Sequence, residues 1–377
     1  MQIMAAVLEA SGLPPPYADS RPLQVRTVDL NGPGSGEVLV RIVAAGLCHS
    51  DLSVIEGTRP RPLPMVLGHE AAGVVEEVGP GVSDLRPGDH VVCVFVPSCG
   101  TCEYCCEGRP ALCVPGATSN GEGTLLSGDR RLFWNEHHDP LNHHLGISAF
   151  AQYATVARQS LVKVDPDLDP RHAALFGCAV LTGVGAALNG AAVTAGDTVA
   201  IIGLGGVGMA ALLGARAAGA ERIVAVDVAT QKLEWARELG ATDTFLATDP
   251  HAAEAIRDAT KGGVRKAIEL AGSASALELA YKITRRGGTM VTAGLPPPTT
   301  SLAIPAVGLV AEEKSVKGSY LGSTVPARDI PRYIRLFQRG HLPVDRLLTA
   351  EMPLSEINSG FDRLRAGSML RGIVSIT

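Results

Sequence analysis

A glycine-rich stretch that follows directly on an apolar run constrains the fold of this chain more than any other feature. Residues 199–208 read Val-Ala-Ile-Ile-Gly-Leu-Gly-Gly-Val-Gly and lead into an alanine-rich run. This spacing permits a tight strand-to-helix turn and close approach of the backbone to a pyrophosphate, which the N–H groups of the helix N-terminus would bind. A turn that binds another nucleotide, or none, is the alternative. We expect dinucleotide contacts from Gly203, Leu204, Gly205, Gly206, Val207 and Gly208.

The residue at the end of the next apolar run indicates which dinucleotide would bind. Asp227 lies 19 residues after Gly208, where a carboxylate would accept hydrogen bonds from ribose hydroxyls. Its negative charge would repel a 2′-phosphate, and residues 228–231 contain no arginine. The sequence therefore favours NAD over NADP.

The order of strand-like and helix-like segments divides the chain into two kinds of structure. Residues 1–165 contain short valine-rich stretches separated by glycine and proline, typical of a mainly β domain. Further on, apolar strands alternate with helical patterns, as in a doubly wound parallel sheet. We predict strands at 199–203, 223–227, 266–270 and 289–294, and helices at 207–218 and 230–239. The predicted fold class is α/β, with a mainly β domain over 1–178, an inserted nucleotide-binding domain over 179–320 and a return to the first domain over 321–377.

Composition argues against several classes of function. The 33 basic and 38 acidic residues give a formal net charge of −5, and aromatic residues make up 4%, which disfavours binding to nucleic acid or to an anionic membrane. Residues 173–196 are uncharged and long enough to span a bilayer, but their glycines and Asn189 favour a buried helix that leads into a buried strand. The first ten residues show no secretory signal, so we expect a cytoplasmic protein.

Four closely spaced cysteines predict a structural zinc site. The pattern is Cys99-x2-Cys102-x2-Cys105-x7-Cys113, and four thiolates in such a loop can close a tetrahedral site around the ion. An iron–sulfur cluster is the main rival, but there the fourth cysteine follows after three residues, where this chain has Arg109. Disulfides are disfavoured by the cytoplasmic interpretation, and four free cysteines on such polar sequence would be exposed.

Three more residues of metal-binding type lie far apart in the sequence. Cys48, His69 and Cys178 could supply the three ligands of a catalytic zinc site, which leaves its fourth position open. Asp51 and Glu70 lie near two of these residues, where carboxylates could orient an imidazole and tune the charge. Taken singly, a buried cysteine is usually a small hydrophobic residue, and we assign that structural role to Cys93 and Cys106.

Together these motifs resemble the zinc-dependent alcohol dehydrogenases of the medium-chain dehydrogenase/reductase family. The resemblance rests on residues 46–52 (Gly-Leu-Cys-His-Ser-Asp-Leu), 67–70 (Leu-Gly-His-Glu), 87–89 (Pro-Gly-Asp), the four-cysteine loop and 203–208, and it extends to Arg371. It implies a GroES-like catalytic domain with an inserted Rossmann domain, two zinc ions per chain and NAD. It further implies a homodimer, or alternatively a tetramer, that oxidises a medium-chain or aromatic primary alcohol and reduces the aldehyde in reverse.

The resemblance also assigns roles to single residues. Cys48, His69 and Cys178 match the catalytic zinc ligands, the four-cysteine loop matches the structural ones, and Ser50 matches the hydroxyl that takes the alcohol proton. Phe95 matches a wall of the substrate pocket. Coenzyme contacts are implied for His49 and Arg371 at the pyrophosphate, Asp227 and Lys232 at the adenosine ribose, and Thr182, Ala293, Gly294, Leu295, Ser319, Tyr320 and Leu321 along the nicotinamide half. A surface role for the charged residues and a core role for the threonine are the alternatives.

Departures from the family pattern bear on the substrate and on proton transfer. Ser53 stands where many members carry a relay histidine, and Arg59 and uncharged 114–118 argue against the glutathione–formaldehyde adduct. Three alternative functions remain: oxidation of that adduct, a reductase activity of the same family, and a non-enzymatic role as a zinc-stabilised nucleotide sensor. Residues 116–146 are expected to fold near the pocket or over the structural zinc, with solvated rather than metal-binding histidines at 137, 138, 143 and 144.

Overall fold

The computed structural model describes residues 1–134 and 137–376, which form two compact units. The first unit contains residues 1–178, 325–334 and the chain from 348 onward. The second unit contains residues 179–324 and 335–347. The whole of 321–377 was predicted to belong with the first domain, whereas 321–324 and 335–347 group with the second unit. The reason is that α12 (Pro326–Gln338) runs from one unit into the other, and the following turn packs on a helix of the second unit.

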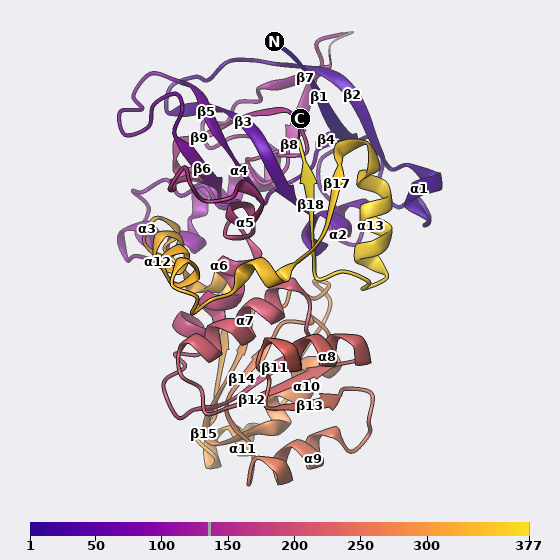
Figure 1. Cartoon of the computed structure of the whole chain (residues 1–377), viewed down its shortest axis with the longest axis vertical. Coiled ribbons are helices and arrows are strands. Elements are labelled where there is room, and N and C mark those ends of the chain that lie inside the picture. Colours follow the sequence, from indigo (N-terminus) through magenta and orange to yellow (C-terminus); the bar gives the residue numbers. More distant parts are fainter. Residues whose placement is uncertain (135–136, 377) are drawn as a thin grey trace. The chain divides into compact units, whose positions relative to one another are not determined.

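The first unit is mainly β, as predicted. Strands β1, β2, β7, β8 and β4 form a closed barrel, and a second sheet has the order β10-β6-β5-β3-β18-β17, with β9 also paired to β3. The last strand, yellow in Figure 1, thus pairs with a strand from the first fifty residues. The strands are β1 (Gln2–Leu8), β2 (Leu23–Leu30), β3 (Glu37–Gly46), β4 (Met65–Val66), β5 (Ala71–Val78), β6 (His90–Cys93), β7 (Leu132–Trp134), β8 (Pro140–His143), β9 (Tyr153–Ala157), β10 (Leu161–Lys163), β17 (Leu348–Pro353) and β18 (Arg371–Ser375).

Short helices cover these sheets, and a continuous apolar core lies beneath them. Val38, Val40 and Ile42 point from β3 into this core, which also takes Phe150 and Phe361. Strand β3 is buried along nearly its whole length, as its run of valine, isoleucine and alanine suggests. The helices are α1 (Tyr17–Ser20), α2 (His49–Ile55), α3 (Glu103–Cys106), α4 (Val114–Glu122), α5 (Pro170–Leu175) and α13 (Ile357–Arg365).

The second unit is a parallel sheet with the strand order β13-β12-β11-β14-β15-β16. This is the doubly wound order of a Rossmann fold, with helices packed against the strands (Figure 1). The fold class was therefore predicted correctly. The strands are β11 (Thr198–Ile202), β12 (Arg222–Asp227), β13 (Asp243–Leu246), β14 (Val264–Glu269), β15 (Thr284–Thr292) and β16 (Ser315–Gly318), and the helices are α6 (Ala179–Gly185), α7 (Gly206–Ala217), α8 (Thr230–Leu239), α9 (Ala252–Ala259), α10 (Ala274–Ile283) and α11 (Ala306–Ala311).

Glycine is required where β11 turns into α7. Gly203 has a φ of 90°, a conformation that other residues rarely adopt. A Cβ atom on Gly208 would lie 1.8 Å from the carbonyl oxygen of Gly203. The two glycines therefore let the first turn of α7 start directly against the end of the strand.

The uncharged segment 173–196 is mostly buried helix as far as Ala187, as expected from its composition, and its last six residues form a turn that leads to β11. It ends α5, forms α6 and continues through a wide turn, η3 (Ala186–Gly190), toward β11. Across the two described stretches of the chain, each helix is too short or too polar to reach through a lipid bilayer.

Candidate metal centres and nucleotide site

Cys48, His69 and Cys178 meet in the first unit although they are far apart in the sequence. Cys48 precedes α2, His69 lies between β4 and β5, and Cys178 follows α5. One ligand atom of each lies within 4.8 Å of the others, and all three side chains are buried. Gly177 allows this approach, because a Cβ atom there would be 2.3 Å from the carbonyl oxygen of Cys93. The three predicted ligands thus form one cluster.

The chemistry of this cluster fits zinc. Nε2 of His69 is buried and has no hydrogen-bond partner among the described residues, as expected for a nitrogen that binds a metal. A hydrogen bond with Cys178 holds the pKa of the Cys48 thiol well below its usual value, and the same bond raises the pKa of Cys178. One thiol is therefore ready to act as a thiolate, the form that binds metal. Three ligands of sulfur and nitrogen type suit a catalytic site with an open fourth position.

Asp51 holds the other ring nitrogen of His69. Nδ1 of His69 lies 3.1 Å from the carboxylate of Asp51, which also accepts a 3.1 Å hydrogen bond from the backbone N–H of Gly68. Burial opposes ionisation of Asp51, but His69 and His144 outweigh it and lower its pKa. A carboxylate in this position fixes the tautomer that leaves Nε2 free for a metal.

Glu70 and Arg371 form a buried ion pair next to the ligands. The guanidinium of Arg371 donates to a carboxylate oxygen of Glu70, and both side chains are at most 2% exposed. Gly46 makes room for this pair, because a Cβ atom there would be 2.5 Å from Oε1 of Glu70. Burial lowers the pKa of Arg371, but the charges of Glu70 and Cys48 outweigh it and raise that pKa above its usual value. Arg371, predicted as a pyrophosphate contact, is thus paired with Glu70, the residue after the candidate ligand His69.

The four-cysteine loop has the geometry of a structural zinc site. Sγ atoms of Cys99, Cys102, Cys105 and Cys113 all lie within 4.8 Å of one another. Backbone N–H groups point at the sulfurs: that of Cys102 lies 3.3 Å from Sγ of Cys99, and that of Gly116 lies 3.4 Å from Sγ of Cys113. Hydrogen bonds led by the N–H of Thr101 lower the pKa of Cys99 to about 6. Four such thiols fit tetrahedral zinc.

In the second unit, Asp227 lies at the carboxyl end of β12, beside the glycine turn. Its Oδ2 accepts a 2.7 Å hydrogen bond from the backbone N–H of Leu204, and its Oδ1 accepts one from Ala229. Nζ of Lys232 lies 4.0 Å from the same carboxylate. The structure therefore brings both predicted ribose contacts to the turn that carries Gly203–Gly208.

Other predicted coenzyme contacts also gather at the carboxyl edge of the parallel sheet. Ala293–Leu295 follow β15, and Ser319–Leu321 follow β16. Thr182 on α6 lies beside that second segment, since a Cβ atom on Gly322 would be 2.7 Å from the Thr182 carbonyl oxygen. Sequence reasoning missed Glu269, which is buried and accepts hydrogen bonds from Gly272 N–H and the Thr292 hydroxyl.

The predicted substrate-site residues lie close to the metal ligands or on the same helix. The ring of Phe95 packs edge-on against that of His69, with centroids 5.3 Å apart. His49 and Ser50 belong to α2, directly after Cys48; His49 is exposed and Ser50 is partly buried. Ser53, at the relay position, donates its hydroxyl hydrogen to the carbonyl oxygen of Ser50 at 2.9 Å.

Two of the four histidines in segment 116–146 are buried, so the expectation of solvated histidines is wrong for them. His143 accepts a 3.0 Å hydrogen bond from the backbone N–H of Arg131, and burial lowers its pKa to about 3. Nδ1 of His144 lies 3.0 Å from Oδ1 of Asp51. His137 and His138 are exposed, as expected. The error arose because a polar stretch without periodicity gives no signal of burial.

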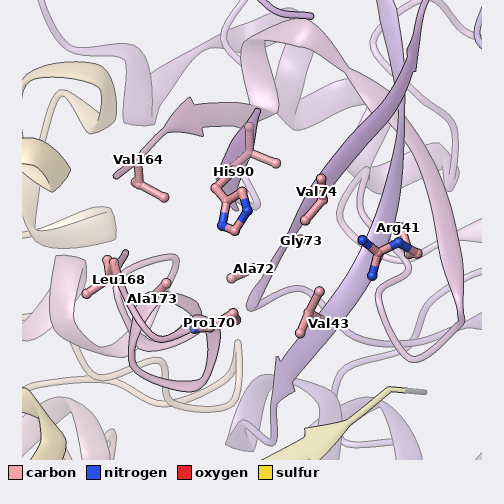
Figure 2. A pocket seen from close by; sticks show the side chains of 11 residues that line it. Arg41, Val43, Ala72, Gly73, Val74, His90, Val164, Leu168, Pro170 and Ala173 are labelled. Carbon is pink, nitrogen blue, oxygen red and sulfur yellow. The ribbon is translucent and has the colours of Figure 1, made fainter. Parts of the chain in front are cut away.

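A cavity of about 250 Å³ lies elsewhere in the first unit (Figure 2). Apolar residues such as Val43, Val74 and Leu168 line it, together with the imidazole of His90. None of the residues that line it belongs to the metal-ligand clusters. The cavity is therefore separate from both clusters of candidate metal ligands.

Comparison with known proteins relates this chain to alcohol dehydrogenases. Residues 34–166 match the alcohol dehydrogenase GroES-like domain, and residues 206–339 match the zinc-binding dehydrogenase domain. A Mycobacterium tuberculosis relative, provisionally named alcohol dehydrogenase D, is 42% identical over 99% of this chain and 100% of its own length. The NDMA-dependent alcohol dehydrogenase of Amycolatopsis methanolica is 40% identical over 99% of both chains. An Escherichia coli S-(hydroxymethyl)glutathione dehydrogenase is 36% identical over 95% of this chain and 97% of its own length.

Solved structures agree with these sequence matches. Benzyl alcohol dehydrogenase from Acinetobacter calcoaceticus is 34% identical, with a TM-score of 0.93 and complete coverage of both chains. An alcohol dehydrogenase zinc-binding domain protein from Burkholderia ambifaria is 36% identical, with a TM-score of 0.94 over 100% of this chain and 99% of its own.

Proposed function

Because this chain belongs to the zinc-dependent alcohol dehydrogenases of the medium-chain dehydrogenase/reductase family, we propose that it transfers hydride reversibly between a primary alcohol and NAD. The cluster of Cys48, His69 and Cys178 carries the proposal, because three ligands with an open fourth position suit a catalytic rather than a structural metal. Two zinc ions per chain are proposed, with the second in the four-cysteine loop. The first unit would act as the catalytic domain and the second as the coenzyme domain.

Each residue around the cluster has a defined task in this proposal. Zinc held there supplies Lewis-acid polarisation of the substrate oxygen, and NAD supplies the hydride acceptor. Asp51 orients His69, and Glu70 neutralises Arg371. Ser50 takes the proton of the alcohol; since Ser53 replaces the usual relay histidine, the next proton acceptor is water, the nicotinamide ribose or His49.

We propose a medium-chain or aromatic primary alcohol, or the matching aldehyde, as substrate. Phe95 next to His69 supports this, since an aromatic ring there would form an apolar wall close to the reacting atoms. Similarity to benzyl alcohol dehydrogenase over the whole chain also supports it. The glutathione–formaldehyde adduct is the second candidate, because an Escherichia coli relative carries that name. Arg59 and the uncharged residues 114–118 argue against it.

The proposal includes a homodimer in the cytoplasm. Strand β16 is an exposed edge of the parallel sheet, and α11, which precedes it in the chain, exposes Val307 and Val310 at 77% and 78%. An open edge and exposed apolar side chains favour association with a second copy. A tetramer is the alternative. All eight cysteines are free, which suits a reducing compartment.

The deciding experiment follows NADH formation by the purified protein with NAD⁺ and a series of short, long and aromatic primary alcohols. We expect turnover that is highest with medium-chain or aromatic alcohols and is abolished when a chelator removes zinc. A parallel assay offers NDMA as acceptor, because one relative is named for dependence on it. Absence of turnover with every alcohol and aldehyde, despite bound zinc and NAD, would contradict the proposal.

Ser50→Ala separates the enzyme from a zinc-stabilised nucleotide sensor. Loss of a group that takes a proton lowers turnover by about 10²–10⁴-fold. We therefore expect this variant to bind NAD as the wild type does but to lose turnover on that scale. A sensor would need no such hydroxyl, so unchanged turnover would argue for another role of the site.

Asp227→Asn is expected to weaken the preference for NAD over NADP. Asparagine keeps an acceptor for the Leu204 N–H but removes the charge that repels a 2′-phosphate. Interactions of charged hydrogen-bonding groups contribute about 1.5–3 kcal/mol. The ratio of kcat/KM with NAD to kcat/KM with NADP should therefore fall by about 10–100-fold. Asp243→Asn is the matched control, because that carboxylate pairs with Arg222 and should leave the ratio unchanged. An unchanged ratio in Asp227→Asn would exclude this role.

A further inference from the structure

Two imidazoles, not one, lie against the carboxylate of Asp51. Nδ1 of His69 is 3.1 Å from it, and Nδ1 of His144 is 3.0 Å from its Oδ1. The two histidine rings meet edge-on, with centroids 5.5 Å apart. All three side chains are at most 1% exposed. The carboxylate that orients a predicted zinc ligand is therefore shared with a second histidine.

The backbone holds His144 in this place. It directly follows β8, and its N–H donates a 2.9 Å hydrogen bond to the hydroxyl of Ser148, which in turn donates to the carbonyl oxygen of Val66. The His144 carbonyl oxygen accepts from the N–H groups of Ile147 and Ser148. Leu145 and Ser148 have φ values of 52° and 58°, which non-glycine residues adopt infrequently. This tight turn fixes the imidazole against Asp51.

The contact also determines which ring nitrogen carries hydrogen. An ionised carboxylate can only accept, so the proton between the two side chains belongs to Nδ1 of His144. Nδ1 of His144 and Oδ2 of Asp51 are buried and lack an aligned hydrogen bond in the described structure. Nδ1 of His144 can donate, and the Asp51 carboxylate, whose Oδ1 lies 3.0 Å away, can accept.

We propose that His144 is a positioning residue of the catalytic metal site, which acts through Asp51 on His69. By donating from Nδ1 it would hold the Asp51 carboxylate in the orientation that receives the His69 N–H. His69 Nε2 would then stay directed at the metal. This inference rests on the proposed catalytic zinc, and the zinc content of the wild type tests that premise separately.

A third metal ion offers a different explanation for the same three side chains. One atom each of Asp51, His69 and His144 lies within 4.8 Å of the others, close enough for shared coordination. That arrangement would require His69 to lose both ring protons when Nε2 also binds zinc. If Asp51 accepts hydrogen bonds from both histidines, His69 keeps its Nδ1 proton. We therefore favour a positioning role for His144, and the test includes the number of metal ions per chain.

The experiment compares the full-length wild type with His144→Leu, His144→Asn and His143→Leu. Asparagine can present its amide N–H near the position of Nδ1, whereas leucine cannot. His143→Leu removes the neighbouring buried imidazole, which bonds to Arg131 rather than to Asp51. The readouts are zinc per chain, the rate of zinc release to a chromogenic chelator, the visible spectrum of the cobalt-substituted protein, and kcat/KM for benzyl alcohol with NAD⁺.

Loss of a group that orients a metal ligand weakens metal binding or activity by about 10–100-fold. We expect His144→Leu to release the catalytic zinc faster on that scale and to alter the cobalt spectrum. His144→Asn should stay within about threefold of the wild type, and His143→Leu should match it in zinc release even if it is less stable. Three results would each overturn the proposal. His144→Leu could release zinc at the wild-type rate, or His144→Asn could release zinc as fast as His144→Leu. The wild type could also contain a third zinc ion that His144→Leu loses.

Discussion

Replacing Cys178 with serine is expected to lower alcohol turnover by at least about 10³-fold. Lewis-acid polarisation contributes several kcal/mol to the stability of the transition state, and each 1.4 kcal/mol corresponds to a factor of ten in rate. Serine removes one of the three buried ligands, and the remaining Cys48 and His69 cannot close the site. Zinc content should fall from two ions per chain to one. Metal analysis and NADH formation on the same preparation measure both effects.

Cys93→Ala is the matched control for this substitution. Cys93 is buried in the same unit, but it belongs to none of the clusters of potential metal-binding side chains among the described residues. The control should keep two zinc ions and most of its activity. Two zinc ions in Cys178→Ser would remove Cys178 from the ligand set.

Replacing Cys105 with serine is expected to lower the stability of the first unit by several kcal/mol. Structural zinc contributes about 10–16 kcal/mol of binding free energy to small metal-dependent folds, and this loop has few other buried side chains. If about 3 kcal/mol of this is lost to the whole unit, the thermal midpoint falls by about 10 °C. Differential scanning calorimetry with metal analysis tests this directly.

Cys106→Ser provides a control one residue away. Cys106 is exposed, and its thiol donates to the carbonyl oxygen of Thr101 instead of joining the four-sulfur cluster. This variant should keep both the second zinc ion and the thermal midpoint of the wild type. A drop in Cys106→Ser as large as that in Cys105→Ser would mean that stability does not depend specifically on the four clustered thiols.

Most of the parallel sheet could be predicted from local sequence patterns. Segments 199–203, 223–227, 266–270 and 289–294 correspond to β11, β12, β14 and the end of β15. Strands β13 and β16 were not predicted, because neither carries a buried apolar run: β13 is half-buried and β16 is exposed throughout. An edge strand forms through backbone pairing with its neighbour, so the pattern of its own side chains does not predict it.

The candidate metal ligands could be predicted for a different reason. Few kinds of side chain bind zinc, so cysteines and histidines at suitable spacing leave only a small number of possible ligand sets. The contacts of the carboxylates beside these ligands, such as Glu70, were harder to predict from the sequence. Glu70 pairs with Arg371 through the pairing of the last strand with β3, and that contact joins residues from distant parts of the chain.

The sequence by itself determined the glycine-rich turn between strand and helix, the alternation of strands and helices that makes a parallel sheet, and the two sets of candidate metal ligands. These depend on residue chemistry and on short-range geometry, such as the positive φ of Gly203. Only the tertiary structure decided that residues 335–347 join the second unit, that His143 and His144 are buried, and that Asp51 lies against two imidazoles. Burial and contact between distant segments arise from packing of the whole unit, because no local pattern records which surfaces will meet.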